Sequence, residues 1–429
     1  MIGSAMSAWL AEEGITRSNI GFFGFIFVAY SVNFLWSPLL DRVKLPLLGP
    51  WLGQRRAWVV LMQLLIGLCC WAIASVSPSS DLAYAQLIAF ALALASATQD
   101  VAIDAFRIDS LPSDDSGLMA AGSAMATAGW WTGFAGLGAI PLILVDLDSW
   151  VWADVYQLMA VIMLALVVVP LMASEPVTLR ELAQSKLHDK YASYVSGESG
   201  AGTRFYVSQH WLRHILVWLM IGFVEPLREF FNRNGVRLAL SILLFIFLFK
   251  IGEAFLGRMS IVFYKEVGFS NTDIALYSKI ISWWVTIVFS LIGSLVTIKY
   301  GILRGLFIGG FAMGASNLMF ALVAVVGPDK AVLVSAVIVD GFTSAWSTVA
   351  FVAFLSMMCN RAFTASQYAL MASLGTLGRT LLASYSGLMV DYLDGNWQLF
   401  FVITALMVLP SLLLLYRIRH RLRDMSSEF

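Results

Sequence analysis

Eleven long apolar segments, separated by polar connections, constrain the fold of this 429-residue chain more than any other feature. A helix needs about 20 consecutive apolar residues to cross the hydrocarbon core of a bilayer. The chain is 59% hydrophobic and 13% charged, whereas a soluble domain has about 25% charged residues. We therefore predict an all-α polytopic membrane protein. Its predicted spans are 20–40, 58–76, 82–106, 118–144, 155–173, 238–257, 274–298, 306–326, 332–358, 368–390 and 399–416.

A long polar linker, residues 174–237, separates five of these spans from the other six. Residues 1–10 are apolar but too short to cross a bilayer, so we expect them to be the end of a span whose beginning is absent. One such incomplete span gives two halves of six helices, 1–173 and 238–429. The apolar part of the linker, 210–231, carries charges and a proline, and we predict that it lies on the membrane surface as an interfacial helix. A deeper insertion or an additional span is the alternative.

The two halves also match weakly in sequence. Residues 18–20 resemble 272–274, and residues 118–120 resemble 370–372. Six helices repeated about an axis along the membrane normal are the architecture of the major facilitator superfamily. Its members bind substrate near the bilayer midplane between the halves.

The distribution of basic residues predicts the orientation of the chain. Arg42, Lys44, Arg55 and Arg56 lie in the first connection, whereas the connections at 77–81 and 145–154 contain acidic residues and no base. Cytoplasmic loops are enriched in Lys and Arg. The tail after the last span contains four arginines, so we expect the C-terminus to be cytoplasmic: Arg417, Arg419, Arg421 and Arg423.

Composition and motifs exclude several classes of protein. The net charge is zero, which argues against a nucleic-acid partner, because that affinity depends on clustered Lys and Arg. Cys69, Cys70 and Cys359 have no metal-ligand spacing and indicate no disulfide framework. No GxGD, HExxH, GxSxG or GxxxxGK[ST] motif occurs, so neither an intramembrane protease nor an ATP-driven pump is supported. We expect no cofactor, no metal and no enzyme activity.

A charged stretch follows the apolar run 82–94. Asp100, Asp104 and Arg107 are spaced i, i+4 and i+7, which places them on one face of a helix. Charges inside a membrane helix usually face a protein interior or a water-filled pathway. A structural interpretation remains open, in which Asp104 and Arg107 form an ion pair at the helix end and Asp109 lies at the water boundary.

The second half contains further charges within apolar surroundings. Lys250 and Glu253 are spaced i, i+3, and either form an intrahelical ion pair or bind a substrate carboxylate and exchange protons. Asp340 has no base nearby in sequence, and an isolated carboxylate in hydrocarbon becomes neutral by taking up a proton. Lys279 could pair with it or extend outward. Arg379 could bind an anionic group or another carboxylate.

Several sequence motifs resemble those of the AmpG-type muropeptide permeases. They are QDVAIDAFR at 99–107, SPLLDR at 37–42, FKIGEAF at 249–255, GFSNTDIALYSK at 268–279 and CNRAFTASQYALMASLGTLGR at 359–379. Acetyl-coenzyme A transporters share parts of this pattern. The resemblance covers nearly the whole chain, but the first transmembrane helix is almost wholly lacking and the linker is longer than in short members.

This resemblance implies a proton-driven importer of N-acetylglucosaminyl-1,6-anhydro-N-acetylmuramyl peptides for cell-wall recycling. It would be a monomeric multi-pass protein of the bacterial inner membrane, with the muropeptide, protons and the lipid bilayer as partners. An acyl-CoA or another polar or anionic metabolite is the alternative substrate, and a truncated homologue without transport activity is another alternative. The candidates for proton coupling are Asp100, Asp104, Glu253 and Asp340. A disaccharide peptide also needs polar and positive side chains, and the candidates for substrate binding are Gln99, Arg107, Lys250, Arg379, Asn33 and Tyr30.

Overall fold

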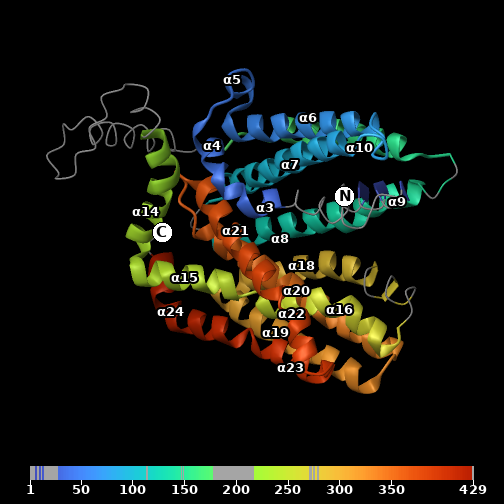
Figure 1. Ribbon diagram of the computed structural model, residues 1–429. Helices are drawn as coiled ribbons and strands as arrows, with labels where there is room; N and C mark the ends of the chain where they lie inside the picture. The colour runs from blue at the N-terminus through green and yellow to red at the C-terminus, as the bar shows by residue number, and fades with distance from the viewer. Residues whose placement is uncertain are drawn as a thin grey trace.

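The computed structural model describes residues 5–6, 9–10, 12–13, 28–112, 115–145, 147, 149–176, 217–269, 273, 276–277 and 280–427. These residues form helices and connections, and none of them forms a β-strand. Figure 1 shows the helices in two groups, α3 to α11 above and α15 to α24 below, with most of them running in nearly the same direction.

The first group comes from the N-terminal part of the chain. It consists of α3 (Val28–Val32), the 3₁₀ turn η2 (Asn33–Leu35), α4 (Ser37–Arg42), α5 (Gly49–Leu52), α6 (Gln54–Ala74), α7 (Leu82–Ser110), α8 (Ser116–Trp131), the π-helical turn η3 (Thr132–Gly136), α9 (Leu137–Val145), α10 (Trp152–Leu166) and α11 (Val168–Met172).

The second group follows residues 177–216, which lie outside the described part. It comprises the π-helical turn η4 (Met220–Val224), α14 (Glu225–Asn234), α15 (Val236–Leu248), α16 (Ile251–Val267), α18 (Ile281–Tyr300), α19 (Ile302–Val326), α20 (Lys330–Met357), α21 (Thr364–Ala383), α22 (Ser386–Tyr392), α23 (Trp397–Leu406) and α24 (Leu409–Ser427).

Eight helical stretches among the described residues are long and apolar enough to cross a membrane. They correspond to eight of the predicted spans, and the all-α membrane fold is confirmed. The other three predicted spans are interrupted. A π-helical turn separates α8 from α9, a short break separates α21 from α22, and the first span is described only from Val28 onward as α3, η2 and α4.

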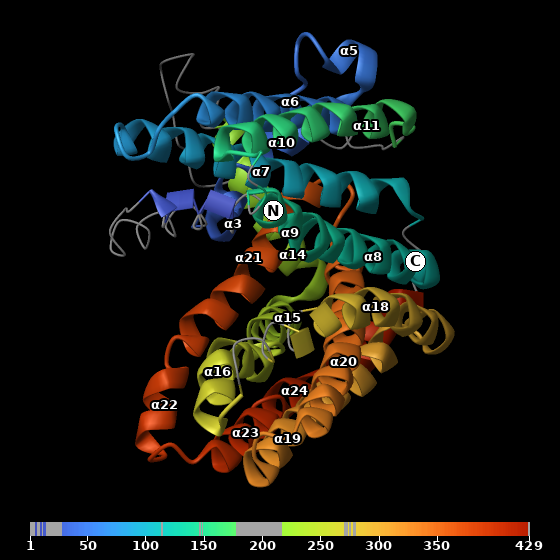
Figure 2. The same ribbon diagram turned by 90° about the vertical axis from the view of Figure 1, so that its right-hand side faces the viewer.

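Two sets of contacts join the groups. Helix α21 packs against α3, η2, α4 and α7 of the first group and against α15 and α16 of the second. Helix α8 packs against α18 and α20. Figure 2 shows α21 on one side and α8 with α18 on the other. Helices α21 and α8 therefore connect the two groups.

Small residues permit the closest helix approaches. Gly293 in α18 faces Trp346 in α20, and a Cβ at that position would lie 2.9 Å from the Trp346 Cα atom. Gly378 in α21 similarly lies against the Phe247 carbonyl of α15. On the outside of the bundle, large apolar side chains such as Leu68 and Leu295 are exposed, at 63% and 65%. A lipid bilayer covers such surfaces, which explains why they are not polar.

The structure describes residues 174–176 and 217–237 of the linker. Figure 1 shows α14 at one end of the bundle, crossing the direction of the long helices. Pro226, Phe230 and Asn234, spaced by four residues, form its buried face. The C-terminus lies at the same end as α14 (Figure 1). The domain bounds and the interfacial helix stay predictions, because most of the linker lies outside the described residues.

Candidate transport site

Helix α7 carries the charged cluster of the first half. Asp104 and Arg107 form the ion pair that the sequence suggested, with 3.0 Å between Asp104 Oδ1 and Arg107 Nη2. Arg107 also donates to the Ser123 hydroxyl of α8 at 3.3 Å and to the Ser356 hydroxyl of α20 at 3.2 Å. Its guanidinium lies 5.8 Å from the centre of the Tyr368 ring in α21. Arg107 thus connects α7 to both α20 and α21 of the other group.

Asp100 differs from these residues because it makes no hydrogen bond or ion pair within the described part of the chain. Its side chain is exposed although it lies on a long apolar helix. Tyr30 and Tyr368 lie close enough to interact with it electrostatically. Gln99 beside it is half-buried. Asp100 therefore lies near two tyrosine side chains and keeps solvent access.

The polar residues of the first span face neighbouring helices. The Tyr30 hydroxyl donates to the Ser96 hydroxyl of α7 at 2.7 Å. Asn33 is 9% exposed and accepts a hydrogen bond from Ser373 of α21 at 3.1 Å. Asn33 therefore holds two helices together across the groups, whereas Tyr30 lies beside Asp100.

A break between α15 and α16 positions the charged cluster of the second half. Lys250 lies at this break, only 4% exposed, and pairs with Glu253 in the next turn. The Lys250 ammonium also donates to the hydroxyls of Ser347 and Thr348 in α20, both at 2.8 Å. The Ser344 hydroxyl donates to Glu253 at 2.7 Å. Sequence reasoning missed these three α20 hydroxyls, although their i, i+3, i+4 spacing marks one helix face.

Asp340 and Arg379 lie near this cluster. Asp340 accepts a hydrogen bond from Ser316 of α19 at 2.9 Å and interacts electrostatically with Lys250 and Glu253. Arg379 on α21 is exposed, donates to Thr376 at 3.3 Å and lies near enough to affect Lys250 and Glu253. The structure thus brings four of the predicted charged residues together, while Lys279 lies outside the described residues.

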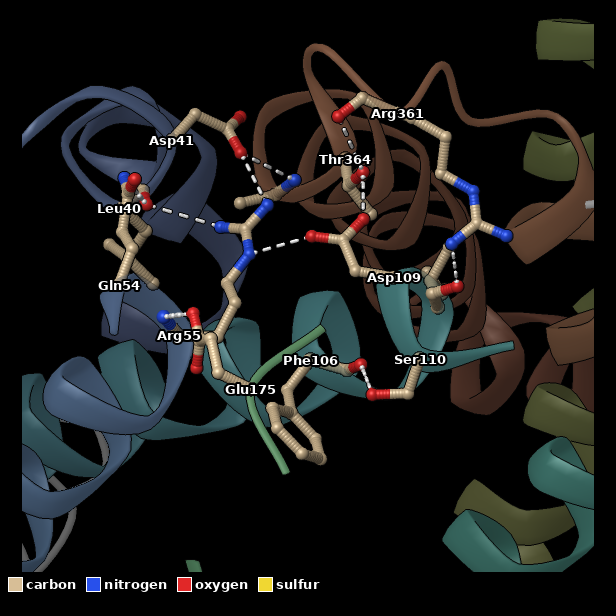
Figure 3. Close-up of polar contacts among 12 residues, drawn as sticks. Leu40, Asp41, Gln54, Arg55, Phe106, Asp109, Ser110, Glu175, Arg361 and Thr364 are labelled. Carbon is tan, nitrogen blue, oxygen red and sulfur yellow. Dashed lines mark hydrogen bonds and ion pairs between the residues drawn. The ribbon is translucent and has the colours of Figure 1, made fainter. Parts of the chain in front are cut away.

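A third polar cluster, which we call the junction, joins the two groups near the ends of the helices (Figure 3). Arg55 of α6 donates to Asp41 of α4 at 2.9 Å and to Asp109 of α7 at 2.8 Å. Asp109 also accepts from the Thr364 hydroxyl at 2.7 Å. Asp41 accepts from the backbone N–H and the hydroxyl of Ser366, at 2.9 and 2.6 Å, and thereby caps the start of α21.

The prediction that Asp109 lies at the water boundary is wrong. Asp109 is 7% exposed as a whole residue and its side chain is 0% exposed, because Arg55 and Thr364 enclose it. Arg361 adds to this junction by donating to the carbonyls of Ile108 and Leu111 at the end of α7 (Figure 3 shows its position). Burial lowers the pKa of the Arg361 guanidinium. In the sequence, the charges of the first connection indicated only the orientation of the chain. In the structure, Arg55 of this connection binds Asp41 and Asp109, and these two carboxylates bind residues of α21 in the other group.

No group of three or more His, Cys, Asp or Glu side chains that could hold a metal occurs among the described residues. The described side chains of the two charged clusters form ion pairs and hydrogen bonds with hydroxyl groups. Two buried cations, Arg107 and Lys250, are each held by a carboxylate and by hydroxyls. Such groups can bind anionic and polar ligands, and a carboxylate without a partner can take up a proton.

The fold defines the class of this protein. Its structure resembles the Escherichia coli fucose:proton symporter FucP, with a TM-score of 0.64, 12% identity, and coverage of 97% of this chain and 94% of that chain. It also resembles the proton:xylose symporter XylE, with a TM-score of 0.59, 14% identity, and coverage of 97% and 90%. The chain therefore has the major facilitator superfamily fold, and eight of its described helical stretches are long and apolar enough to cross a membrane.

Sequence relatives define the family. The chain is 30% identical over 424 residues to the anhydromuropeptide permease of Escherichia coli (strain K12), covering 98% of this chain and 77% of the relative. It is 29% identical over 415 residues to the putative transporter AmpG 4 of Rickettsia felis, covering 97% and 91%. The family described as acetyl-coenzyme A transporter 1 matches residues 10–89. The chain belongs to the anhydromuropeptide permease (AmpG) family.

Proposed function

We propose that this protein imports anhydro-muropeptides across the bacterial inner membrane in symport with protons. The observation that carries this proposal is the 30% identity to the Escherichia coli anhydromuropeptide permease across 98% of the chain. In this proposal the protein works as a monomer, with halves 1–173 and 238–429 joined by the cytoplasmic linker 174–237. The arginine-rich tail supports a cytoplasmic C-terminus.

The chemistry of the polar clusters supports a substrate with carboxylates, amides and hydroxyls. Arg107 and Lys250 offer positive charge from opposite halves, and each is surrounded by hydroxyl groups. Arg379 is exposed on α21, which packs against both halves. A peptide carboxylate can bind one of these cations, while sugar and amide groups bind hydroxyls and Gln99. Binding then favours the state in which both halves contact the ligand.

The pattern of partners supports Asp100 as the proton-coupling residue. Asp104 and Glu253 are each held in an ion pair, at 3.0 Å for Asp104 and with Lys250 for Glu253. Asp340 has the Ser316 hydroxyl as donor. Asp100 has no hydrogen-bond or ion-pair partner in the described part of the chain and has solvent access. Its charge can therefore change without breaking an ion pair, which favours it over Asp104 and Glu253, and without losing a hydrogen-bond donor, which favours it over Asp340.

The experiment is uptake of labelled anhydro-muropeptide into right-side-out vesicles that contain the full chain. An inward proton gradient should drive accumulation, and a protonophore should reduce it to the level of vesicles without the protein. Exchange of external and internal muropeptide should continue without a gradient, because exchange needs no net proton movement. Accumulation that a protonophore does not reduce would contradict proton coupling. Failure of both accumulation and exchange would contradict the substrate.

A second candidate substrate is an acyl-CoA, because the acetyl-coenzyme A transporter family matches residues 10–89. The same vesicles discriminate between the two. Unlabelled anhydro-muropeptide should compete with the labelled substrate, whereas acetyl-CoA at the same concentration should not. Competition by acetyl-CoA alone, with uptake of labelled acetyl-CoA, would replace the muropeptide proposal.

A further inference from the structure

A small groove lies between α19 and α24, away from the polar clusters between the halves. Its volume is about 230 Å³, and it is lined by Leu303, Arg304, Phe307, Ile308 and Arg419. Helices α19 and α24 pack against each other at the outer edge of the second half (Figure 1). The groove therefore faces the surroundings of the bundle and not the path between the halves.

Among the described residues, neither Arg304 nor Arg419 of the groove forms an ion pair with a carboxylate. The Arg419 guanidinium stacks 3.7 Å from the centre of the Tyr416 ring, and Tyr416 contacts Phe307 edge-on at 6.3 Å. This stacking restrains Arg419 before any ligand binds. The groove thus presents two positive charges, one of them ordered, that nothing in this part of the chain neutralises.

Exposed apolar side chains continue from these arginines along both helices. On α19, Ile308 and Phe311 follow Arg304 at i+4 and i+7, on the same face, and are 44% and 65% exposed. On α24, Leu413 precedes Tyr416 by three residues, in the apolar part of the helix, and is 68% exposed. A bilayer covers such side chains. The arginines therefore lie where the apolar surface of the bundle meets the polar ends of its helices.

We propose that this groove binds an anionic phospholipid, with its phosphate between Arg304 and Arg419 and its acyl chains along the apolar side chains of α19 and α24. Arginine binds phosphate through two parallel hydrogen bonds. Basic pockets between membrane helices are suited to anionic head groups. A free phosphate ion would leave the apolar stripe unused, and a zwitterionic lipid would bring a positive group to two uncompensated cations. The shape and the charge together select the anionic lipid.

The test measures lipid binding to the purified full chain in detergent by native mass spectrometry. Phosphatidylglycerol should remain bound, phosphatidylcholine should not, and inorganic phosphate at the same concentration should not displace the lipid. The variant R304A/R419A should bind phosphatidylglycerol about 25-fold more weakly, from about fivefold per arginine near an anionic surface. The matched control R417A/R421A removes two exposed charges of the same tail that do not line the groove, and its binding should be close to that of the unchanged protein.

Three results would overturn the proposal. Equal retention of phosphatidylcholine would exclude charge selection, and displacement by inorganic phosphate would indicate a site for the free ion. Equal losses in R304A/R419A and R417A/R421A would show a diffuse effect of the basic tail. Because retention of the lipids by the unchanged protein is compared first, the proposal can fail even where a variant does not fold.

Discussion

Two sets of ion pairs in this protein use the same chemistry in different surroundings. In the junction at the helix ends, the side chains of Arg55, Asp41 and Asp109 are at most 1% exposed. In the clusters deeper between the halves, the carboxylates of Asp104 and Glu253 are 26% and 28% exposed. The first set is closed to solvent and the second is open to it. A closed set stabilises one arrangement of the halves, whereas an open set can exchange partners with a ligand or a proton.

The largest expected effect comes from Asp100, the open carboxylate without a partner among the described residues. Asp100→Asn should reduce gradient-driven uptake to background while leaving membrane insertion and muropeptide exchange intact, because the amide cannot carry a proton. Vesicle uptake with and without a gradient measures this. Asp391→Asn, at an exposed carboxylate of α22, should transport normally. Normal accumulation by Asp100→Asn would remove Asp100 from the coupling mechanism.

The next largest effect is expected at the closed junction. Arg55→Leu leaves Asp41 and Asp109 buried without their guanidinium, which should destabilise the fold by about 3–5 kcal/mol. Thermal unfolding of the purified protein measures this loss. The triple variant that also carries Asp41→Asn and Asp109→Asn should be more stable than Arg55→Leu, because it removes the two uncompensated charges. A triple variant of lower stability than Arg55→Leu would show that the two buried charges left without their guanidinium are not the cause.

A moderate effect is expected from Asp109→Asn. At a water boundary this change would be mild, but the structure shows Asp109 bound to Arg55 and Thr364. Loss of the charged hydrogen bond should cost about 2 kcal/mol, seen as a lower unfolding temperature. Asp391→Asn serves again as control and should unfold like the unchanged protein. If the two variants unfold alike, the junction does not depend on the charge of Asp109.

The smallest effect is expected at the contact between the open cluster and the other half. Ser356→Ala removes the hydroxyl of α20 that accepts from Arg107 at 3.2 Å, which should cost about 1 kcal/mol. Ser335→Ala, at an exposed hydroxyl of the same helix that donates to its own backbone, should have no measurable effect on unfolding. Equal behaviour of these variants would show that the bridge from Arg107 does not stabilise this arrangement.

Sequence reasoning identified the charged residues inside apolar helices but could not assign their partners on other helices. The i, i+3 spacing of Asp104 with Arg107 and of Lys250 with Glu253 gave each ion pair as one of two interpretations, because neighbours on one helix face are determined locally. The contacts of Arg107 with Ser356 and of Asp41 with Ser366 join residues 249 and 325 positions apart. No local pattern encodes such contacts. Asp109 was misplaced for the same reason.

The sequence by itself determined that the chain is a bundle of membrane helices with charges at particular depths, because apolar length and helical spacing are local properties. It also carried the resemblance to the permease family. Only the tertiary structure decided which charges are closed to solvent and which are open. Burial and partnership depend on how distant helices pack, so the contrast between Asp109 and Asp100, which lie on one helix, arises from α21 and α6 and not from α7 itself.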